Sequence, residues 1–393
     1  MRKIIDSKDK EQAMDLAELC YHESKNQFVR FFKEIEDFSL FGIFEEDILK
    51  SAAGFFEFKM FMREQLFKCS GIAYVMTHPV SRKKGYVKQL MNEIVLQNYK
   101  DGYDLSALWP FRHSFYQKYG YESCEKTISY KFSPSNIKPE FKLGENIEIE
   151  DITETDDFSP LRFIAENAAN KYTRVIGNSA AWTVRSRLQP PYKIYLFKRN
   201  KEPVAYISFK FRSLSEWEHH LNIMDFAFID IEAKKSVFAF LRKFEADIRS
   251  ILVHFPYQEE INSYLATPVG EHKFNQWPGM VRILNVKNCF ERLDYSPNLE
   301  TILYCRIKDE IINENDGTWK LEISNQKCVA EKISNDSADE NKILEITIRQ
   351  LAQILTGHLT IKKMYEATTT KVPDEWLNTE LFPEMPCALM IWF

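Results

Sequence analysis

The chain has 393 residues, enough for two or three domains, because a single core rarely grows beyond a few hundred residues. Hydrophobic residues make up 45% of the chain, and only 12 Gly and 15 Pro argue against long disordered stretches. With 52 Lys and Arg against 57 Asp and Glu, the formal net charge of −5 does not suggest a general nucleic-acid-binding protein, although a local basic patch stays open.

The cysteines and the chain start bear on metal sites and location. The seven Cys are scattered singly without a Cys-x-x-Cys pair, and the eight His lack the HExxH spacing. We therefore expect reduced, buried thiols and no metal site. The opening MRKIIDSKDKEQ has no apolar core of a signal peptide, and no stretch reaches the length of a membrane helix. These features predict a soluble, cytoplasmic protein.

The N-terminal section mixes strand-like and helix-like patterns. Segments KSAAGFFEFKMFM (50–62) and QLFKCSGIAYVMTHP (65–79) are predicted to form neighbouring antiparallel strands. A helix is predicted after Pro79, because apolar residues recur there at the spacing of one helical face. These residues are Val87, Leu90, Met91, Ile94 and Val95. Gly102 follows as the expected stop.

The middle section, about 155–285, repeats this order after the acidic stretch GENIEIEDITETDD (144–157), which we interpret as a solvated linker or edge strand in preference to a cation site. A hairpin is predicted over 192–212 and a helix over 232–252. The apolar face of that helix comprises Val237, Phe240, Leu241, Phe244 and Ile248. The section reads as a degenerate second copy of the first, without a glycine where its helix opens.

The last section, about 286–393, predicts a small α+β domain. Strand-like segments lie at 302–310, 318–324 and 327–333, and IRQLAQILTG (348–357) predicts a short helix ending at a glycine. The chain then finishes on the apolar run MPCALMIWF. Because chain ends usually fray in water, either this terminus is buried for packing or its carboxylate is needed in a dry site.

Three cations, Arg82, Lys83 and Lys84, come directly before Gly85 and the predicted helix. Positive charge at a helix N-terminus opposes the helix dipole at a cost of about 0.3–1 kcal/mol per charge. An anionic ligand would remove this conflict, and the free N–H groups of the first turn, with Gly85 allowing close approach, suit a pyrophosphate. The alternative is a solvated charge run before an ordinary helix.

The segment RKKGYV (82–87) resembles the R-x-x-G-x-G/A coenzyme A signature of GNAT acetyltransferases, with Val87 at the last position. The longer run TxPxxRxxGxxxxLM and the segment SALWPFRHSFYQKYGYE (106–122) resemble the Eis family, the enhanced intracellular survival acetyltransferases, in which a bulky residue at that position is usual. In the last section, DGTWKLEISNQKCVA and LAQILTGHLT resemble a sterol-carrier-protein-like domain.

The resemblance covers the whole chain and implies an α/β (α+β) fold with tandem GNAT domains and a C-terminal sterol-carrier-protein-like (SCP2-like) domain. The expected boundaries are a catalytic domain at 1–150, a degenerate second GNAT domain at 151–285, and at 286–393 the sterol-carrier-like domain that carries the catalytic C-terminus. Family members form hexamers, so a homo-oligomer is expected.

The resemblance also implies acetyl-coenzyme A as the cofactor. Main-chain groups at the strand end would pair with the pantetheine arm, the loop and first helical turn would surround the pyrophosphate, and a tyrosine would lie near the thiol. The implied contacts are Val75, Met76, Thr77, Arg82, Lys83, Lys84, Gly85, Tyr86, Val87, Lys88 and Tyr116.

Two catalytic roles follow from the same resemblance. Tyr121 stands at the position of the general acid that protonates the coenzyme A sulfur, its alternative being a core tyrosine. The family's last residue is commonly an aromatic whose α-carboxylate is the general base, which implies Phe393; the alternative is an apolar terminal strand. A chain-end carboxylate has a reference pKa of about 3.3–3.7, and burial beside Trp392 would raise it toward the range of a useful base.

The expected activity is direct transfer of acetyl from acetyl-coenzyme A to a primary amine of an aminoglycoside, a polyamine or a lysine side chain. In aminoglycoside-modifying members an acidic residue precedes the final aromatic, and here Trp392 replaces it. Acidic residues of the N-terminal region could compensate, namely Glu23, Glu36, Asp37, Glu45 and Glu46. Two other hypotheses are a hydrolase or acyltransferase with Cys124 as nucleophile, and a lipid carrier with a vestigial GNAT domain.

Overall fold

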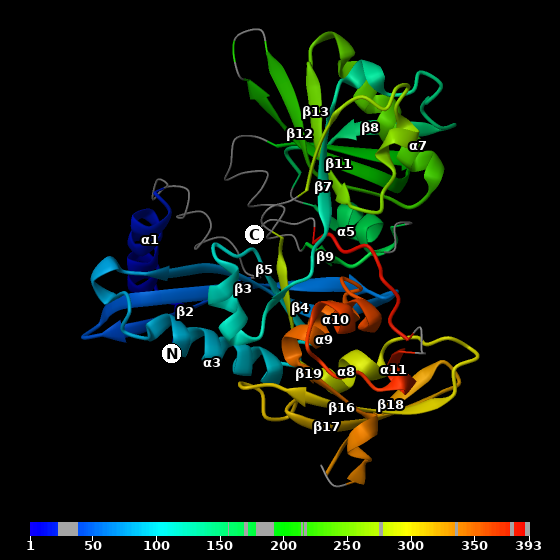
Figure 1. Ribbon diagram of the computed structural model, residues 1–393. Helices are drawn as coiled ribbons and strands as arrows, with labels where there is room; N and C mark the ends of the chain where they lie inside the picture. Colours follow the sequence, from blue (N-terminus) through cyan, green and yellow to red (C-terminus); the bar gives the residue numbers. More distant parts are fainter. Residues whose placement is uncertain are drawn as a thin grey trace.

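The computed structural model describes residues 1–22, 38–155, 157–168, 172–177, 192–213, 215, 218–274, 278–334, 337–377 and 381–389. Within these residues the strands form three sheets of eight, seven and four strands. The first sheet lies between the second, at the top of Figure 1, and the third, at the bottom. None of the described helices is both long and apolar enough to cross a membrane.

The first sheet has the order β1-β2-β3-β4-β5-β15-β6, and β9 pairs with β3 beside this path. Its strands are β1 (Arg2–Lys3), β2 (Phe38–Glu45), β3 (Ile48–Met62), β4 (Gln65–Thr77), β5 (Leu105–Leu108), β6 (Glu122–Ser123), β9 (Arg174–Ile176) and β15 (Met280–Ile283). The predicted antiparallel pairing of 50–62 with 65–79 is confirmed as β3 against β4.

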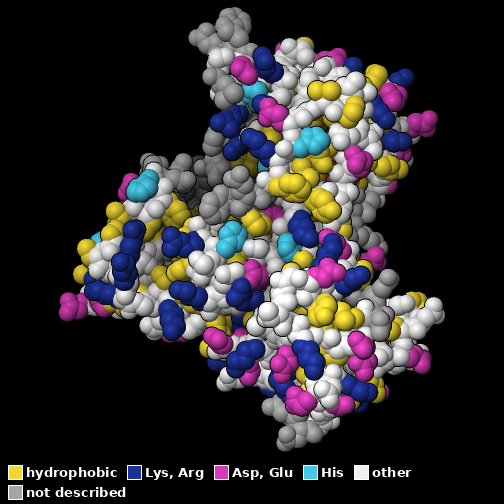
Figure 2. Space-filling model, viewed as in Figure 1, with side chains coloured by type: hydrophobic (Ala, Val, Ile, Leu, Met, Phe, Trp, Pro, Cys, Tyr) yellow, Lys and Arg dark blue, Asp and Glu magenta, His cyan; other side chains and the backbone are white. Residues whose placement is uncertain are grey.

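Helices α1 (Ser7–Tyr21) and α3 (Tyr86–Lys100) cover opposite faces of this sheet. Successive strand residues point to opposite faces, and Ala52 of β3 packs in the core with α1 whereas Ala53 packs in the core with α3. The predicted apolar face of α3 is confirmed, since Leu90, Met91, Ile94 and Val95 are buried against the sheet and Val87 is partly buried beside them. In Figure 2, Lys and Arg side chains gather over the surface that α3 occupies in Figure 1.

The second sheet has the order β14-β7-β13-β12-β11-β10-β8. Its strands are β7 (Thr127–Phe132), β8 (Ile147–Asp151), β10 (Lys193–Arg199), β11 (Glu202–Ser213), β12 (His219–Phe228), β13 (Ser250–Pro256) and β14 (Glu271–Phe274). Helices α5 (Ser159–Glu166) and α7 (Ile231–Arg242) pack into two separate cores against it. The hairpin predicted over 192–212 is confirmed, and the acidic stretch 144–157 contributes the edge strand β8.

The helix predicted over 232–252 was too long. It ends at Arg242, a 3₁₀ turn continues over Lys243–Ala246, and Ile251 belongs to strand β13. The apolar run from Ser250 pairs in parallel with β12, so a tertiary strand pairing overrides the helical pattern of the segment. The helix begins at Ile231, one residue before the predicted start, because the Asp230 side chain caps it by accepting from Ala233 N at 2.8 Å.

The two large sheets exchange strands across the predicted boundaries at 150 and 285. Strand β7 precedes the first boundary yet pairs in the second sheet, and β15 follows the second sheet's strands yet lies between β5 and β6 of the first. The two large sheets are therefore joined through backbone hydrogen bonds, because each contains a strand from the other side of a predicted boundary.

The third sheet has the order β18-β17-β16-β19. Its strands are β16 (Thr301–Lys308), β17 (Gly317–Ser324), β18 (Lys327–Ile333) and β19 (Ile343–Thr347), and the helices of this part are α8 (Val286–Glu291), α9 (Ile348–Leu355), α10 (Ile361–Ala367) and α11 (Asp374–Leu377). The predicted strands and the helix at 348–357 are confirmed. One core joins Phe67 of β4 to Leu303 of β16 and Leu351 of α9, so this domain packs directly on the first sheet.

Candidate functional site

Two central strands of the first sheet, β4 and β5, separate at one end. β4 and β5 run parallel and pair only from Cys69 opposite Leu105 to Ile72 opposite Leu108. Beyond Ile72, β4 continues to Thr77, and no described strand covers this edge. A bulge sets two β4 residues, Tyr74 and Val75, against the single β3 residue between Ala52 and Gly54, and Tyr74 has φ +52°. The outcome is an open backbone edge at the end of β4.

This open edge leads into a bare helix N-terminus. After β4 the chain makes a 3₁₀ turn (Pro79–Ser81) and reaches Gly85, the N-cap of α3, at φ +90° and without a side-chain capping bond among the described residues. Gln89 N makes the first intrahelical bond of α3, to Gly85 O at 3.0 Å. A Cβ placed on Gly85 would meet nothing within 4 Å, so the space beside this residue is open. The N–H groups of the first turn of a helix have no intrahelical partner.

The predicted phosphate residues lie around this turn. Lys83, which has φ +66°, Lys84 and Lys88 are exposed, and Arg82 Nε lies 3.5 Å from Thr77 O. The structure therefore brings together a helix N-terminus and a group of cations, which is the arrangement that binds phosphate groups. Tyr86 and Val87 are half-buried in the first turn, and the Tyr86 hydroxyl donates to Glu45.

Side chains from α1 reach the end of β4, which the sequence did not reveal. Tyr21 Oη donates to Val75 O at 3.5 Å, and Cys20 Sγ lies 3.6 Å from Thr77 O. Met76 O accepts from Ser51 Oγ of β3 at 2.8 Å. No local signal links Cys20 and Tyr21 to a strand more than fifty residues away, so only the fold could show that the end of α1 borders this site.

Tyr121 lies in the core between the first sheet and α3, with no exposed surface. Its hydroxyl lies 2.7 Å from Ser106 Oγ of β5, and Ser70 Oγ of β4 donates to the same Ser106 oxygen at 2.9 Å. Asn98 of α3 completes the chain by donating to Ser70 Oγ at 2.8 Å. Burial raises the pKa of Tyr121, so its hydroxyl is protonated at neutral pH. Ser70, Ser106 and Asn98 were not predicted from the sequence as site residues.

Tyr116 is also buried, on the short helix α4 (His113–Tyr116), and its ring centroid lies 6.3 Å from that of Tyr121. Burial raises its pKa as well. The motif thus places Tyr116 and Tyr121 in one aromatic cluster on the α3 side of the sheet.

Phe393 and Trp392 lie outside the described residues, as do Glu23, Glu36 and Asp37. The described part of the tail reaches Leu389. The buried carboxylate of Glu125 holds this part of the tail. It accepts from Leu389 N and from Gly279 N, each at 3.0 Å. Thr173 pairs with Cys387 in a parallel bridge beside it. Glu125, which binds the described end of the tail, follows Tyr121 by four residues in the chain.

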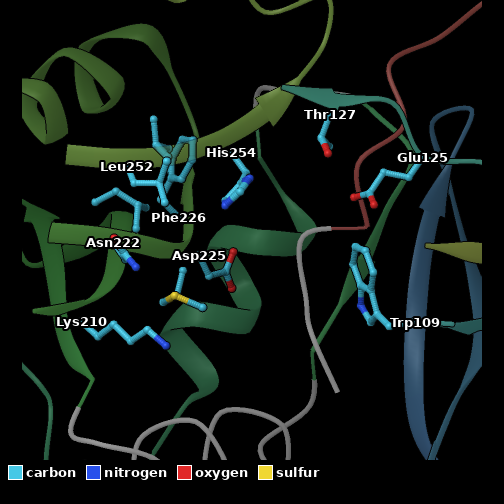
Figure 3. A pocket seen from close by; sticks show the side chains of 12 residues that line it. Trp109, Glu125, Thr127, Lys210, Asn222, Asp225, Phe226, Leu252 and His254 are labelled. Atoms are coloured by element: carbon cyan, nitrogen blue, oxygen red, sulfur yellow. The ribbon is translucent and has the colours of Figure 1, made fainter. Parts of the chain in front are cut away.

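A cavity of about 180 Å³ lies between the first and second sheets (Figure 3). Asp225 of β12, Lys210 of β11 and His254 of β13 reach it from the second sheet, and Trp109 and Glu125 border it from the first. It marks the place where β12 and β13 cease to pair, beyond Asn222 and Leu252, as β4 and β5 do in the first sheet. The second sheet therefore repeats the strand splay of the first.

Cys124 does not have the environment of a nucleophile. The residue has no exposed surface, and burial raises the pKa of its thiol to about 12. Its Sγ lies 3.3 Å from Glu122 O. Because the thiolate is the reactive form, a thiol with this pKa is inert at neutral pH, which disfavours the cysteine-nucleophile hypothesis.

Comparisons with known proteins identify two domains in the chain. Residues 2–124 match the family model described as the acetyltransferase (GNAT) domain, and residues 286–380 match the sterol carrier protein domain. No curated protein matches the chain in a sequence search. The chain thus carries an acetyltransferase (GNAT) domain, which makes it an acyltransferase by class, joined to a sterol-carrier-type domain.

Solved structures share the fold of the entire chain. The GCN5-related N-acetyltransferase of Anabaena variabilis is 18% identical, with TM-score 0.85 over 100% of both chains. A probable N-acyltransferase of Enterococcus faecalis is 17% identical, with TM-score 0.83 over 99% of this chain and 98% of the other. Eis1 of Mycobacterium abscessus is 13% identical, with TM-score 0.79 over 100% of this chain and 99% of the other. The mixed α/β architecture predicted from the sequence is confirmed.

Proposed function

We propose that the protein is an Eis-like N-acetyltransferase that moves acetyl from acetyl-coenzyme A directly to a primary amine in a ternary complex. The observation that carries this proposal is the continuous path from the open edge of β4 to the bare N-terminus of α3 at Gly85. An extended pantetheine arm can pair with the strand edge while the pyrophosphate rests on the helix. Such an arrangement suits a phosphate-bearing thioester.

In this proposal the cofactor follows residues named from the sequence. Val75, Met76 and Thr77 offer main-chain groups to the pantetheine arm, although their carbonyl oxygens already have side-chain partners in Tyr21, Ser51 and Cys20 in the structure. Residues 82–88 surround the pyrophosphate, and Tyr116 lies near the thiol end.

The proposed acid is Tyr121, whose raised pKa keeps the proton on its oxygen until the thiolate leaves. The proposed base is the α-carboxylate of Phe393, which takes a proton from the attacking amine directly or through a water. Support comes from the tail, since Glu125 holds Leu389 N and the four residues beyond can span at most about 14 Å.

The proposed acceptors are primary amines of aminoglycosides, polyamines or lysine side chains. The proposed assembly is a cytoplasmic homo-oligomer, a hexamer as in the family that the sequence resembles.

The alternative function, that of a lipid carrier, has less support. Apolar residues of the sterol-carrier-type domain, such as Leu303 and Leu351, belong to one core with Phe67 of the first sheet, as expected of a scaffold.

The test is an acetyl-coenzyme A assay against a panel of a lysine peptide, a polyamine and an aminoglycoside. It compares the wild-type chain with one extended by a glycine after Phe393, which displaces the carboxylate by about 3.5 Å. We expect amine-dependent release of coenzyme A, at least tenfold slower after the extension, since small misplacements of a catalytic group cost about 100-fold. Phe393→Leu, which keeps the carboxylate in place, is the control and should retain most of the rate.

Absence of amine-dependent turnover with every acceptor would contradict the proposed function. Undiminished turnover of the extended chain would contradict the role of Phe393 alone. A co-purified lipid in the C-terminal domain, together with absent turnover, would favour the carrier.

A further inference from the structure

A fully buried ion pair joins the turn that carries Tyr121 to the sterol-carrier-type domain. Arg282, on the inserted strand β15, donates from Nη2 to both carboxylate oxygens of Asp309 at 2.8 Å. The side chains of Arg282 and Asp309 are 1% and 0% exposed. Burying two charges costs several kcal/mol per ion, and the attraction between them offsets this cost only if the geometry is very good. Apolar residues of similar volume in the same place often give a folded protein that is equally stable or more stable. An ion pair at this place therefore calls for a reason beyond stability.

The second arm of the same guanidinium reaches the tyrosine motif. Arg282 Nη1 donates to Tyr119 O at 2.8 Å. Gly120 follows at φ +79°, and a Cβ there would lie only 1.6 Å from Arg282 Nη1. The guanidinium thus occupies the space that the missing side chain of Gly120 leaves, directly beside the peptide that leads into Tyr121.

Asp309 is itself rigidly held, so the anchor is firm. Its carboxylate accepts from Ile311 N at 3.0 Å and from Asn315 Nδ2 at 3.0 Å in addition to Arg282. Asn315 Nδ2 also donates to Leu284 O, one residue beyond β15, at 2.9 Å. The network connects the end of β16, strand β15 and the Tyr121 turn through buried, charge-assisted hydrogen bonds.

We propose that Arg282 is a positioning residue for Tyr121, which holds the Tyr119–Tyr121 turn so that the Tyr121 hydroxyl stays on Ser106. The inference rests on the proposed function, in which the amine nitrogen bonds to the acetyl carbon and loses its proton to the base, and the thioester C–S bond breaks as the Tyr121 O–H proton passes to the sulfur and leaves a tyrosinate. A nearby guanidinium stabilises that anion. Burial raises the pKa of Tyr121, and the Ser106 hydrogen bond and the charge of Arg282 partly offset the rise.

The test is a double-mutant cycle with Arg282→Met and Tyr121→Phe, read as kcat and as KM for acetyl-coenzyme A. We expect Arg282→Met to lower kcat about tenfold and to leave this KM within about twofold, since general acid catalysis is worth about 100-fold or more. The double variant should be no slower than Tyr121→Phe alone, because a residue that acts through Tyr121 has nothing left to position.

Arg292→Met is the control for loss of an interdomain ion pair. Arg292, whose side chain is 43% exposed, pairs with Asp104 directly before β5 at 2.8 Å, and its other hydrogen bond goes to Leu66 O. It should lose stability without losing kcat. If Arg282→Met does not fold, Arg282→Lys replaces it, because an ammonium can pair with Asp309 but lacks the second arm for Tyr119 O; the same kcat pattern is expected.

Wild-type kcat in a folded Arg282 variant, or losses that multiply in the double variant, would overturn this inference and leave the proposed function standing. A wild-type chain that acetylates no amine would overturn the proposed function, and the inference with it.

Discussion

A tyrosine hydroxyl serves as an acid only when it keeps its proton until the leaving group needs it. Burial gives Tyr121 that property, and the serines at paired positions of β4 and β5, Ser70 and Ser106, provide its hydrogen-bond partner. Ser106 holds the hydroxyl at the sheet, close to the end of the parallel pairing at Leu108. The residue therefore combines the features of a core tyrosine and of a proton donor.

Tyr121→Phe tests this role at the scale of one atom. We expect kcat to fall about 100-fold, the usual worth of general acid catalysis, while KM for acetyl-coenzyme A changes little, because only a proton donor is lost. Steady-state kinetics measure both values. Tyr119→Phe, the same change in the same motif, is the control and should keep wild-type kcat. Equal rates for the two variants would remove Tyr121 from the mechanism.

Among the elements, helix α3 provides the end of the proposed cofactor site that binds phosphate. Gly85 and Gly102 flank this helix, both have positive φ (+90° and +74°), and a Cβ at either would meet nothing within 4 Å. Substitution by alanine therefore imposes a similar backbone strain of about 1–2 kcal/mol at each. Only Gly85 stands where the phosphates are proposed to lie, so the pair separates ligand binding from stability.

Local sequence patterns predicted β3, β4, α3 and α9, since hydrophobic periodicity and glycine stops act within one segment. These local patterns do not indicate which strands pair with one another. Strand β15 inserts between β5 and β6, and nothing in Met280–Ile283 indicates that partner. For the same reason the sequence missed Cys20, Tyr21 and Arg282, whose place at the site comes from contacts between distant segments. The two motifs, around Gly85 and around Tyr121, were visible because each is a short continuous run of residues.

At the scale of the whole molecule, the sterol-carrier-type domain is bound firmly to the first sheet. Arg63, in the turn after β3, donates from Nε to Leu355 O at 2.8 Å, and Lys126 Nζ donates to His358 O at 2.8 Å. Thr173 Oγ1 donates to Thr356 O at 2.9 Å. These bonds converge on the end of α9, where Met385 N of the tail also donates to Gly357 O at 3.0 Å.

His358 at this junction predicts a loss of stability in acid. Burial, and then the charge of Lys126, lower its pKa to about 4. The unfolded chain takes up the proton near its ordinary pKa of about 6.5, so the folded state loses stability as pH falls from 6.5 toward 4 and is unaffected above that range. At pH 5 this group alone should cost about 2 kcal/mol.

Denaturant unfolding at pH 7 and pH 5 measures this effect. His358→Gln should lose about 2 kcal/mol less than wild type between the two pH values. His272→Gln, at an exposed site, is the control and should follow wild type. An equal loss in His358→Gln and wild type would show that the junction does not hold a neutral histidine.

The central claim, a phosphate-bearing thioester lying across the turn at Gly85, is tested most directly by calorimetric titration of coenzyme A. Wild type should bind, Gly85→Ala should bind at least about tenfold more weakly, since an added Cβ blocks close approach of backbone and phosphate, and Gly102→Ala should bind as wild type does. No heat with wild type, or equal affinities for the two alanine variants, would contradict the account.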